Sequence, residues 1–284
     1  MNFSSLNRTW FMDMVYYNWC KDYPTAPLIW SGFSAVCYLM GFPASLMALC
    51  ELLQRQRLKV FNNIFMISLS VIDLAFTVFI PFSACNYMIW HNCQFEWVSN
   101  FVYSLIIIGR PLFMACVCGD CHIAVIHPIT YMTSKKLFVI KSTISMTLWI
   151  FIVCFSSLIS SLTWMITSPV SSIPLFIALP AIFYYEIAVL RALRKPVPCG
   201  NGSIHPQKKQ AIRTIFNSFI MTFIAYLPPA FFFSIGNLML TEIERACTSV
   251  IYGVCFSMAG SVIMPILYLN GVGKLNTFKK WWKH

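Results

Sequence analysis

The chain has 284 residues, of which 58% are apolar and only 10% are charged, whereas soluble domains contain about 45–50% apolar and about 25% charged residues. A soluble core cannot absorb this much apolar surface, so the composition indicates lipid as the main solvent and excludes a large soluble domain. The net charge of +11 does not favour nucleic-acid binding, because the basic residues occur in short clusters between apolar stretches.

Seven apolar stretches follow one another along the chain, each long enough for a helix to cross a hydrocarbon layer of roughly 30 Å. In lipid only helices and closed barrels satisfy every backbone polar group, and stretches of this length are helices. We therefore expect an all-α membrane protein, a seven-transmembrane helix bundle at 28–270, with an N-terminal segment at 1–27 and a tail at 271–284. The predicted spans are 28–52, 61–86, 98–126, 139–165, 170–193, 211–236 and 247–270.

The distribution of basic residues predicts the orientation of this bundle. One set of loops and the tail carry most of them, whereas the opposite side offers only Arg8, Lys21 and Arg245. Because basic loops stay in the cytoplasm, we expect a multi-pass plasma-membrane protein with an extracellular N-terminus and a cytoplasmic C-terminus. Asn2 and Asn7 lie in Asn-x-Ser/Thr sequons on the outer segment and are candidate glycosylation sites. The basic and aromatic tail suits a short amphipathic helix in the headgroup region.

Two charged residues, Asp73 and Arg110, lie in the middle of predicted spans. Each would cost several kcal/mol in lipid, so both should face the bundle interior. Asp73 follows Phe61 by 12 residues and Arg110 precedes His122 by 12, which places both roughly 18 Å from the inner surface. We therefore predict an Asp73–Arg110 salt bridge, which either switches or only fixes packing. A transporter or channel that uses this pair is the alternative function from another class.

Three of the 12 cysteines, Cys20, Cys93 and Cys247, fall outside the membrane on the extracellular side, where disulfides persist. They are the disulfide candidates, and three candidates leave the pairing open. We find no His/Glu metal spacing and no paired carboxylates, so the sequence predicts neither an enzyme nor a metal or cofactor site.

Partial motifs occur in a fixed order along the predicted spans. They are Gly41-Phe-Pro43-Ala-Ser45 in the first span, Ser68-Leu-Ser-Val-Ile-Asp73-Leu in the second, Asp120-Cys121-His122 with a run into Pro128 at the end of the third, Trp149 in the fourth, Ala-Tyr226-Leu-Pro228 in the sixth and Met264-Pro265-Ile-Leu-Tyr268 in the seventh. On these motifs the chain resembles the rhodopsin-like (class A) G-protein-coupled receptors, as a divergent orphan member nearest the nucleotide and protease-activated receptor branch.

The resemblance implies a receptor that transmits binding of an unknown extracellular ligand to a heterotrimeric G protein. It implies a cytoplasmic switch of Asp120, Cys121, His122 and Tyr268, in which Cys121 replaces the family arginine. Asp120 then pairs with a loop cation such as Arg55 or Lys59, or is solvated. In the family the aspartate matching Asp73 binds sodium with help from positions that are Ser45 and Met264 here, so the Arg110 guanidinium is expected to replace that ion.

The resemblance also assigns helix hinges to Pro228 and Pro265, because a proline removes a backbone donor in mid-helix. A disulfide between Cys20 and Cys247, as in the nucleotide receptors, or between Cys20 and Cys93 would fit the outer face. Candidates for the ligand pocket lie in the outer thirds of the third, sixth and seventh spans: Tyr103, Phe232, Asn237 and Tyr252.

Overall fold

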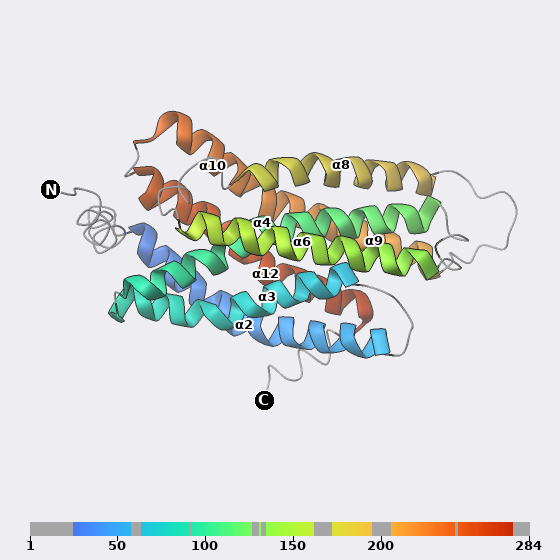
Figure 1. Ribbon diagram of the computed structural model, residues 1–284, viewed down its shortest axis with the longest axis horizontal. Coiled ribbons are helices and arrows are strands. Elements are labelled where there is room, and N and C mark those ends of the chain that lie inside the picture. Colours follow the sequence, from blue (N-terminus) through green and yellow to red (C-terminus); the bar gives the residue numbers. More distant parts are fainter. Residues whose placement is uncertain are drawn as a thin grey trace, which may run out of the picture.

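The computed structural model describes residues 25–57, 64–90, 92–126, 131, 135–161, 172–194, 206–241 and 244–274. In this part of the chain there is no strand, and seven helices are long and apolar enough to cross a membrane. They run side by side in one elongated bundle (Figure 1). The predicted all-α seven-helix bundle is therefore confirmed, and the protein is a multi-pass membrane protein.

The spans are built as follows. The first four are α2 (Thr25–Arg57), α3 (Ile64–Cys85) continued by the π-helical turn η1 (Asn86–Trp90), α4 (Cys93–Ile126) and α6 (Lys135–Ser161). The last three are α8 (Ile173–Arg194), then α9 (Pro206–Met221) joined through the π-helical turn η3 (Thr222–Tyr226) to α10 (Leu227–Met239), and finally the π-helical turn η4 (Arg245–Ser249) joined to α12 (Val250–Val272).

Several helices extend beyond the apolar stretches that predicted them. The first span continues to Arg57 instead of ending at residue 52, and the third begins at Cys93 instead of residue 98. Polar helix ends project past the hydrocarbon layer, where water and headgroups can solvate them, so hydropathy underestimates helix length.

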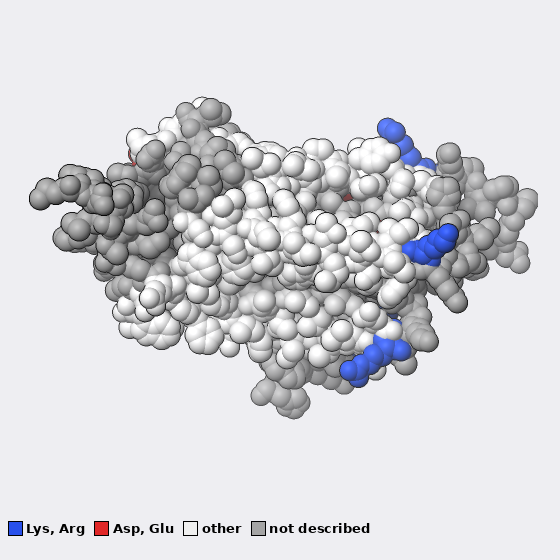
Figure 2. Space-filling view, viewed as in Figure 1, with Lys and Arg blue, Asp and Glu red and all other residues white. Residues whose placement is uncertain are grey.

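Lysine and arginine side chains gather at one end of the bundle, which we call the basic end. The described residues there are Arg55, Arg57, Lys136, Arg191, Arg194, Arg213 and Lys274, and Figure 2 shows blue side chains at the right-hand end of the view. We call the other end the opposite end. At the basic end α12 stops at Gly273, whose left-handed φ of 79° suits glycine, and the Lys274 amide donates to the Leu269 carbonyl at 2.9 Å. The amphipathic helix expected in the tail lies beyond the described residues.

The third span, α4, packs against α3, α6, α8 and α9 and forms the centre of the bundle. Its fully buried side chains include Ile108, Arg110, Phe113 and Met114. By contrast α6 keeps a broad apolar face exposed, with Ile150 at 63% of its full exposure. Such a face is unfavourable in water and suits lipid. The central position of α4 carries Arg110 into the interior.

Candidate functional site

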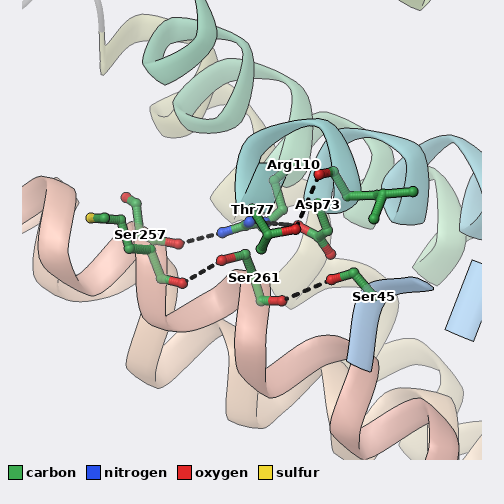
Figure 3. A network of polar contacts seen from close by, with 8 residues as sticks. Ser45, Asp73, Thr77, Arg110, Ser257 and Ser261 are labelled. Carbon is green, nitrogen blue, oxygen red and sulfur yellow. Dashed lines mark hydrogen bonds and ion pairs between the residues drawn. The ribbon is translucent and has the colours of Figure 1, made fainter. Parts of the chain in front are cut away.

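Asp73 of α3 and Arg110 of α4 form a buried ion pair. The guanidinium donates to Asp73 Oδ1 from Nε at 3.0 Å and from Nη2 at 2.5 Å, and each side chain is 1% exposed. Figure 3 shows the two side chains facing each other between their helices. The structure thus contains the ion pair that the sequence predicts, because neither charge could remain in lipid without a partner.

The guanidinium also binds α12. Arg110 Nη1 donates to the backbone carbonyl of Ser257, so one side chain connects three helices (Figure 3). Gly260 makes room for it, since a Cβ at that position would lie 2.7 Å from Arg110 Nη1 and 2.9 Å from the Ala225 Cβ. The absence of a side chain at Gly260 is therefore a condition for the close approach of Arg110 to α12.

The network continues to α2 through the helix defect at Pro265. Pro265 has no N–H to donate to the Ser261 carbonyl one turn earlier, which would leave that buried oxygen without its helical partner. Ser45 of α2 donates its hydroxyl to this carbonyl at 3.5 Å (Figure 3). Met264, in contrast, belongs to the apolar core. Ser45 and Met264 occupy the two positions that help to bind sodium in the receptors that the chain resembles. Ser45 therefore joins the polar network, whereas Met264 packs in the apolar core.

One carboxylate oxygen in this network has no partner. Asp73 Oδ2 is buried and accepts no hydrogen bond from the described residues, and the buried Tyr226 hydroxyl of η3 is likewise unpartnered. The Tyr226 phenol lies close enough to interact electrostatically with both Asp73 and Arg110. The predicted hinge region of the sixth span thus borders the ion pair, because Tyr226 comes two residues before Pro228.

A second polar cluster lies at the basic end, and we call it the clamp. Lys141 Nζ of α6 pairs with Asp120 Oδ1 of α4 at 2.6 Å, and the Tyr131 hydroxyl donates to Asp120 Oδ2 at 3.0 Å. Lys141 Nζ also donates to the Tyr131 hydroxyl at 2.9 Å. Burial, and then the neighbouring Asp120 carboxylate, raises the pKa of Tyr131 above its ordinary value. The phenol therefore keeps the proton that it donates to Asp120.

The clamp corrects the expected partner of Asp120. The expectation of Arg55 is wrong, because Arg55 Nε binds Glu51 Oε1 of its own helix at 2.8 Å, four residues earlier. Lys59 lies outside the described residues. The sequence does not point to Lys141, because a lysine near the start of an apolar stretch is typical of the membrane interface; the packing of α6 turns its side chain inward.

Within the described residues, the other switch candidates, Cys121, His122 and Tyr268, make no side-chain hydrogen bond to Asp120. The Cys121 thiol lies beside Thr214 of α9. His122 lies beside the rings of Tyr184 and Tyr185 of α8, with centroid distances of 6.4 and 5.5 Å. Tyr268 has a buried hydroxyl without a partner among the described residues. Asp120, Cys121 and His122 therefore contact three different helices, α6, α9 and α8, at the basic end.

A third polar cluster, which the sequence patterns do not predict, joins α4, α8 and α9. Glu186 of α8 is 1% exposed, and the Ser218 hydroxyl of α9 donates to its Oε1 at 2.7 Å. Cys118 Sγ of α4 lies 3.0 Å from Ser218 Oγ. Glu186 precedes Arg194 by eight residues, and at this distance from a helix end the sequence position alone does not show whether the side chain turns inward. The signal available was one acid within the otherwise uncharged run from Ile173 to Leu190.

The ligand-pocket candidates fall into two aromatic groups. Tyr103 donates to Ser83 at 3.4 Å and packs edge-on against Phe76 at 5.6 Å. Phe232 of α10 packs against Tyr252 of α12, with a centroid distance of 6.1 Å. The side chain of Asn237 lies outside the described residues, as do the candidate glycosylation sites Asn2 and Asn7.

Of the disulfide candidates, Cys247 is disulfide-bonded. The thiols of Cys20 and Cys93 lie outside the described part of the chain, so its pairing stays a prediction. Within the described residues, no three His, Cys, Asp or Glu side chains are grouped so that they could hold a metal ion. No protein-family model and no curated protein matches the chain.

Proposed function

We propose that the protein is a plasma-membrane receptor of the rhodopsin-like class, which transmits binding of an extracellular ligand to a heterotrimeric G protein. In this proposal the basic end is cytoplasmic, because lysine and arginine clusters are retained on that side. The N-terminus is then extracellular. Asn2 and Asn7 would carry glycans, and tags on the two ends of the chain should be accessible from opposite sides of the membrane.

The observation that carries the proposal is the polar network around Arg110. It joins Arg110 of the third span to Asp73 of the second and to the stretch from Ser257 to Ser261 of the seventh. Ser45 connects that stretch to the first span, so the network involves four spans. Ser45 and Asp73 belong to the motifs on which the resemblance rests, whereas Arg110, Ser257 and Ser261 lie outside those motifs. A buried polar network has few alternative arrangements, so a displacement of one helix must be accompanied by a rearrangement in the others.

The ion pair supports a specific role for Arg110 within this receptor. The guanidinium makes direct contact with the carboxylate that would hold a sodium ion in the family. We infer that the fixed cation on α4 replaces a mobile one, so that the resting bundle does not depend on sodium. The expected result is that sodium and potassium buffers of equal ionic strength give the same thermal stability.

The proposed mechanism is a shift between two populations. Ligand bound near the opposite end favours a state in which α9 moves outward about the hinge formed by η3 and Pro228. At the basic end the clamp takes the place of the missing arginine: Lys141 supplies the positive charge for Asp120 that Cys121 cannot supply. Release of this clamp would open the surface that receives the G protein.

G-protein activation by wild type and Cys121→Arg tests the proposal, with Cys121→Met as the size-matched uncharged control. Basal and ligand-screened activation should be measured for several G-protein classes in the same membranes. We expect activation by wild type and stronger activation by Cys121→Arg, because an arginine adds a charged contact for the partner. If no form activates any G protein, the signalling proposal fails while the fold stands. Ion-dependent uptake by reconstituted vesicles would then favour a transporter.

A further inference from the structure

We propose that Cys118, Ser218 and Glu186 form a hydrogen-bonded latch that holds α9 against α4 and α8 and sets the free energy needed to move α9. This inference rests on the proposed function only in assigning a signalling consequence to that movement. The latch itself follows from the contacts and from the backbone defect beside it.

The three side chains form a directional chain of hydrogen bonds. The Ser218 hydroxyl has one proton and donates it to Glu186 Oε1, at 2.7 Å. The contact of 3.0 Å between Cys118 Sγ and Ser218 Oγ must then use the thiol proton. Ser218 is thus donor to α8 and acceptor from α4, so one hydroxyl group on α9 connects it to both neighbouring helices.

Glu186 is an unusual group for a purely structural contact. It is 1% exposed, its Oε2 has no hydrogen-bond partner among the described residues, and none of their ion pairs includes it. A buried carboxyl group without a cation is costly, and Ser218 is its one hydrogen-bond donor here. If position 186 served only for packing, an apolar side chain there would avoid the cost of burying a carboxyl group. We therefore infer that Glu186 has a role in a change of state of the bundle.

The backbone next to Ser218 is built to bend. Ser218 lies four residues before the π-helical turn η3, and Pro228 and Pro229 follow that turn. Both π-helical turns and prolines interrupt the regular hydrogen-bond ladder and mark hinges. The latch therefore lies on α9 close to the hinge, where bending of the hinge displaces α9 least.

Because the latch lies close to the hinge, a small separation at Ser218 corresponds to a large displacement of the basic end of α9. At 1.5 Å per residue, Ser218 is about 6 Å from Thr222 along the axis, whereas Pro206 is about 24 Å from it. A rotation that opens about 1.5 Å at Ser218 breaks the hydrogen bond to Glu186 and displaces the basic end of α9 by about 6 Å. The latch must therefore open before α9 can move outward.

The test measures the position of α9 directly, in the full-length protein in lipid nanodiscs. Spin labels carried on non-canonical amino acids at the exposed positions 136 of α6 and 212 of α9 report the separation of these helices without thiol chemistry. Ser218→Ala removes one oxygen atom and both hydrogen bonds. Ser156→Ala of α6 is the matched control, because Ser156 is 0% exposed and its hydroxyl has no hydrogen-bond partner in the described part of the chain.

We expect Ser218→Ala to raise the ratio of long to short separations about threefold, with an upper end of about fifteenfold, as interhelical hydrogen bonds in membranes imply. Glu186→Leu should act in the same direction, because it removes the acceptor and retains a large side chain. Glu186→Gln should resemble wild type, because its amide oxygen still accepts from Ser218. Ser156→Ala should leave the distance distribution unchanged.

An unchanged distance distribution in both Ser218→Ala and Glu186→Leu overturns the latch, as does an equal shift in Ser156→Ala. If Glu186→Leu fails to fold, the comparison of Ser218→Ala with Glu186→Gln decides the question. The distance reads helix position without a G protein, so a shift without any G-protein activation supports the latch and rejects the receptor proposal. Activation with no shift does the reverse.

Discussion

Replacing both members of the Asp73–Arg110 pair should be far less harmful than replacing one. The structure gives the reason: both side chains are 1% exposed, and all three hydrogen bonds of Arg110 are made inside the bundle. Asp73→Val leaves the guanidinium buried without its counter-charge. Breaking one side of a buried pair costs about 3–5 kcal/mol, whereas replacing both by apolar groups is often neutral or stabilising.

These values set the expected thermal shifts. At about 2–4 °C per kcal/mol for a domain of this size, Asp73→Val should lower the unfolding midpoint by about 10 °C. Arg110→Met should be milder, because a stranded carboxylate can take up a proton but a stranded guanidinium cannot lose one. The double variant Asp73→Val/Arg110→Met should unfold within a few degrees of wild type.

Tryptophan fluorescence of the purified protein during heating measures these midpoints, since the chain has nine tryptophans. Phe76→Leu, a buried apolar change on α3, serves as a control for general damage to the core. Charge reversal is a less direct test, because an aspartate at position 110 cannot donate to the Ser257 carbonyl. Each single reversal, Asp73→Arg or Arg110→Asp, should reduce surface expression, and the double variant Asp73→Arg/Arg110→Asp should recover only part of that loss. The reasoning is refuted if both single variants match wild type, or if the double variant loses as much as the two single losses combined.

Three further predictions concern the neighbours of this pair and the clamp. Ser45→Ala should lower stability by about 0.5–1 kcal/mol in wild type but have no effect in a Pro265→Ala background, where an N–H again reaches the Ser261 carbonyl; thermal unfolding of the four proteins checks this. Gly260→Ala should lower the unfolding midpoint by several degrees because its Cβ meets Arg110, whereas Gly32→Ala, whose Cβ would have no described atom within 4 Å, should not; equal effects would contradict the clash. Tyr131→Phe should lower the free energy of unfolding, and the difference from wild type should be constant from about pH 6 to 9. The difference should shrink only above about pH 10, because the raised pKa keeps the proton on the folded-state phenol while the unfolded-state phenol ionises. A difference that already disappears near neutral pH would contradict that assignment.

The ion pair was predictable because the membrane removes alternatives. A charge in the middle of a span must find a partner, and two charges at the same depth on consecutive spans satisfy each other. The same argument does not determine the partners of Asp120 and Glu186, which lie nearer to helix ends. There, solvent or a loop cation is an equally favourable partner, so position along the chain does not decide whether the side chain turns inward.

Contacts between helices decide these cases. The inward face of α6 brings Lys141 to Asp120, and the packing of α8 and α9 brings Glu186 to Ser218. Ser45 illustrates the same limit: its role depends on a carbonyl that Pro265 leaves free 216 residues later in the chain. Each of these partnerships joins residues whose mutual orientation no local pattern encodes.

The amino-acid order alone determined the number of spans, the depth of Asp73 and Arg110 and the end of the bundle at which basic residues collect. These properties follow from transfer of single helices between water and lipid, an energy that each segment carries independently. The rotation of each helix about its axis, and with it the clamp, the latch and the third contact of Arg110, was decided only in the folded bundle. Rotation depends on how seven surfaces pack together, and that energy belongs to pairs of helices and to no single one.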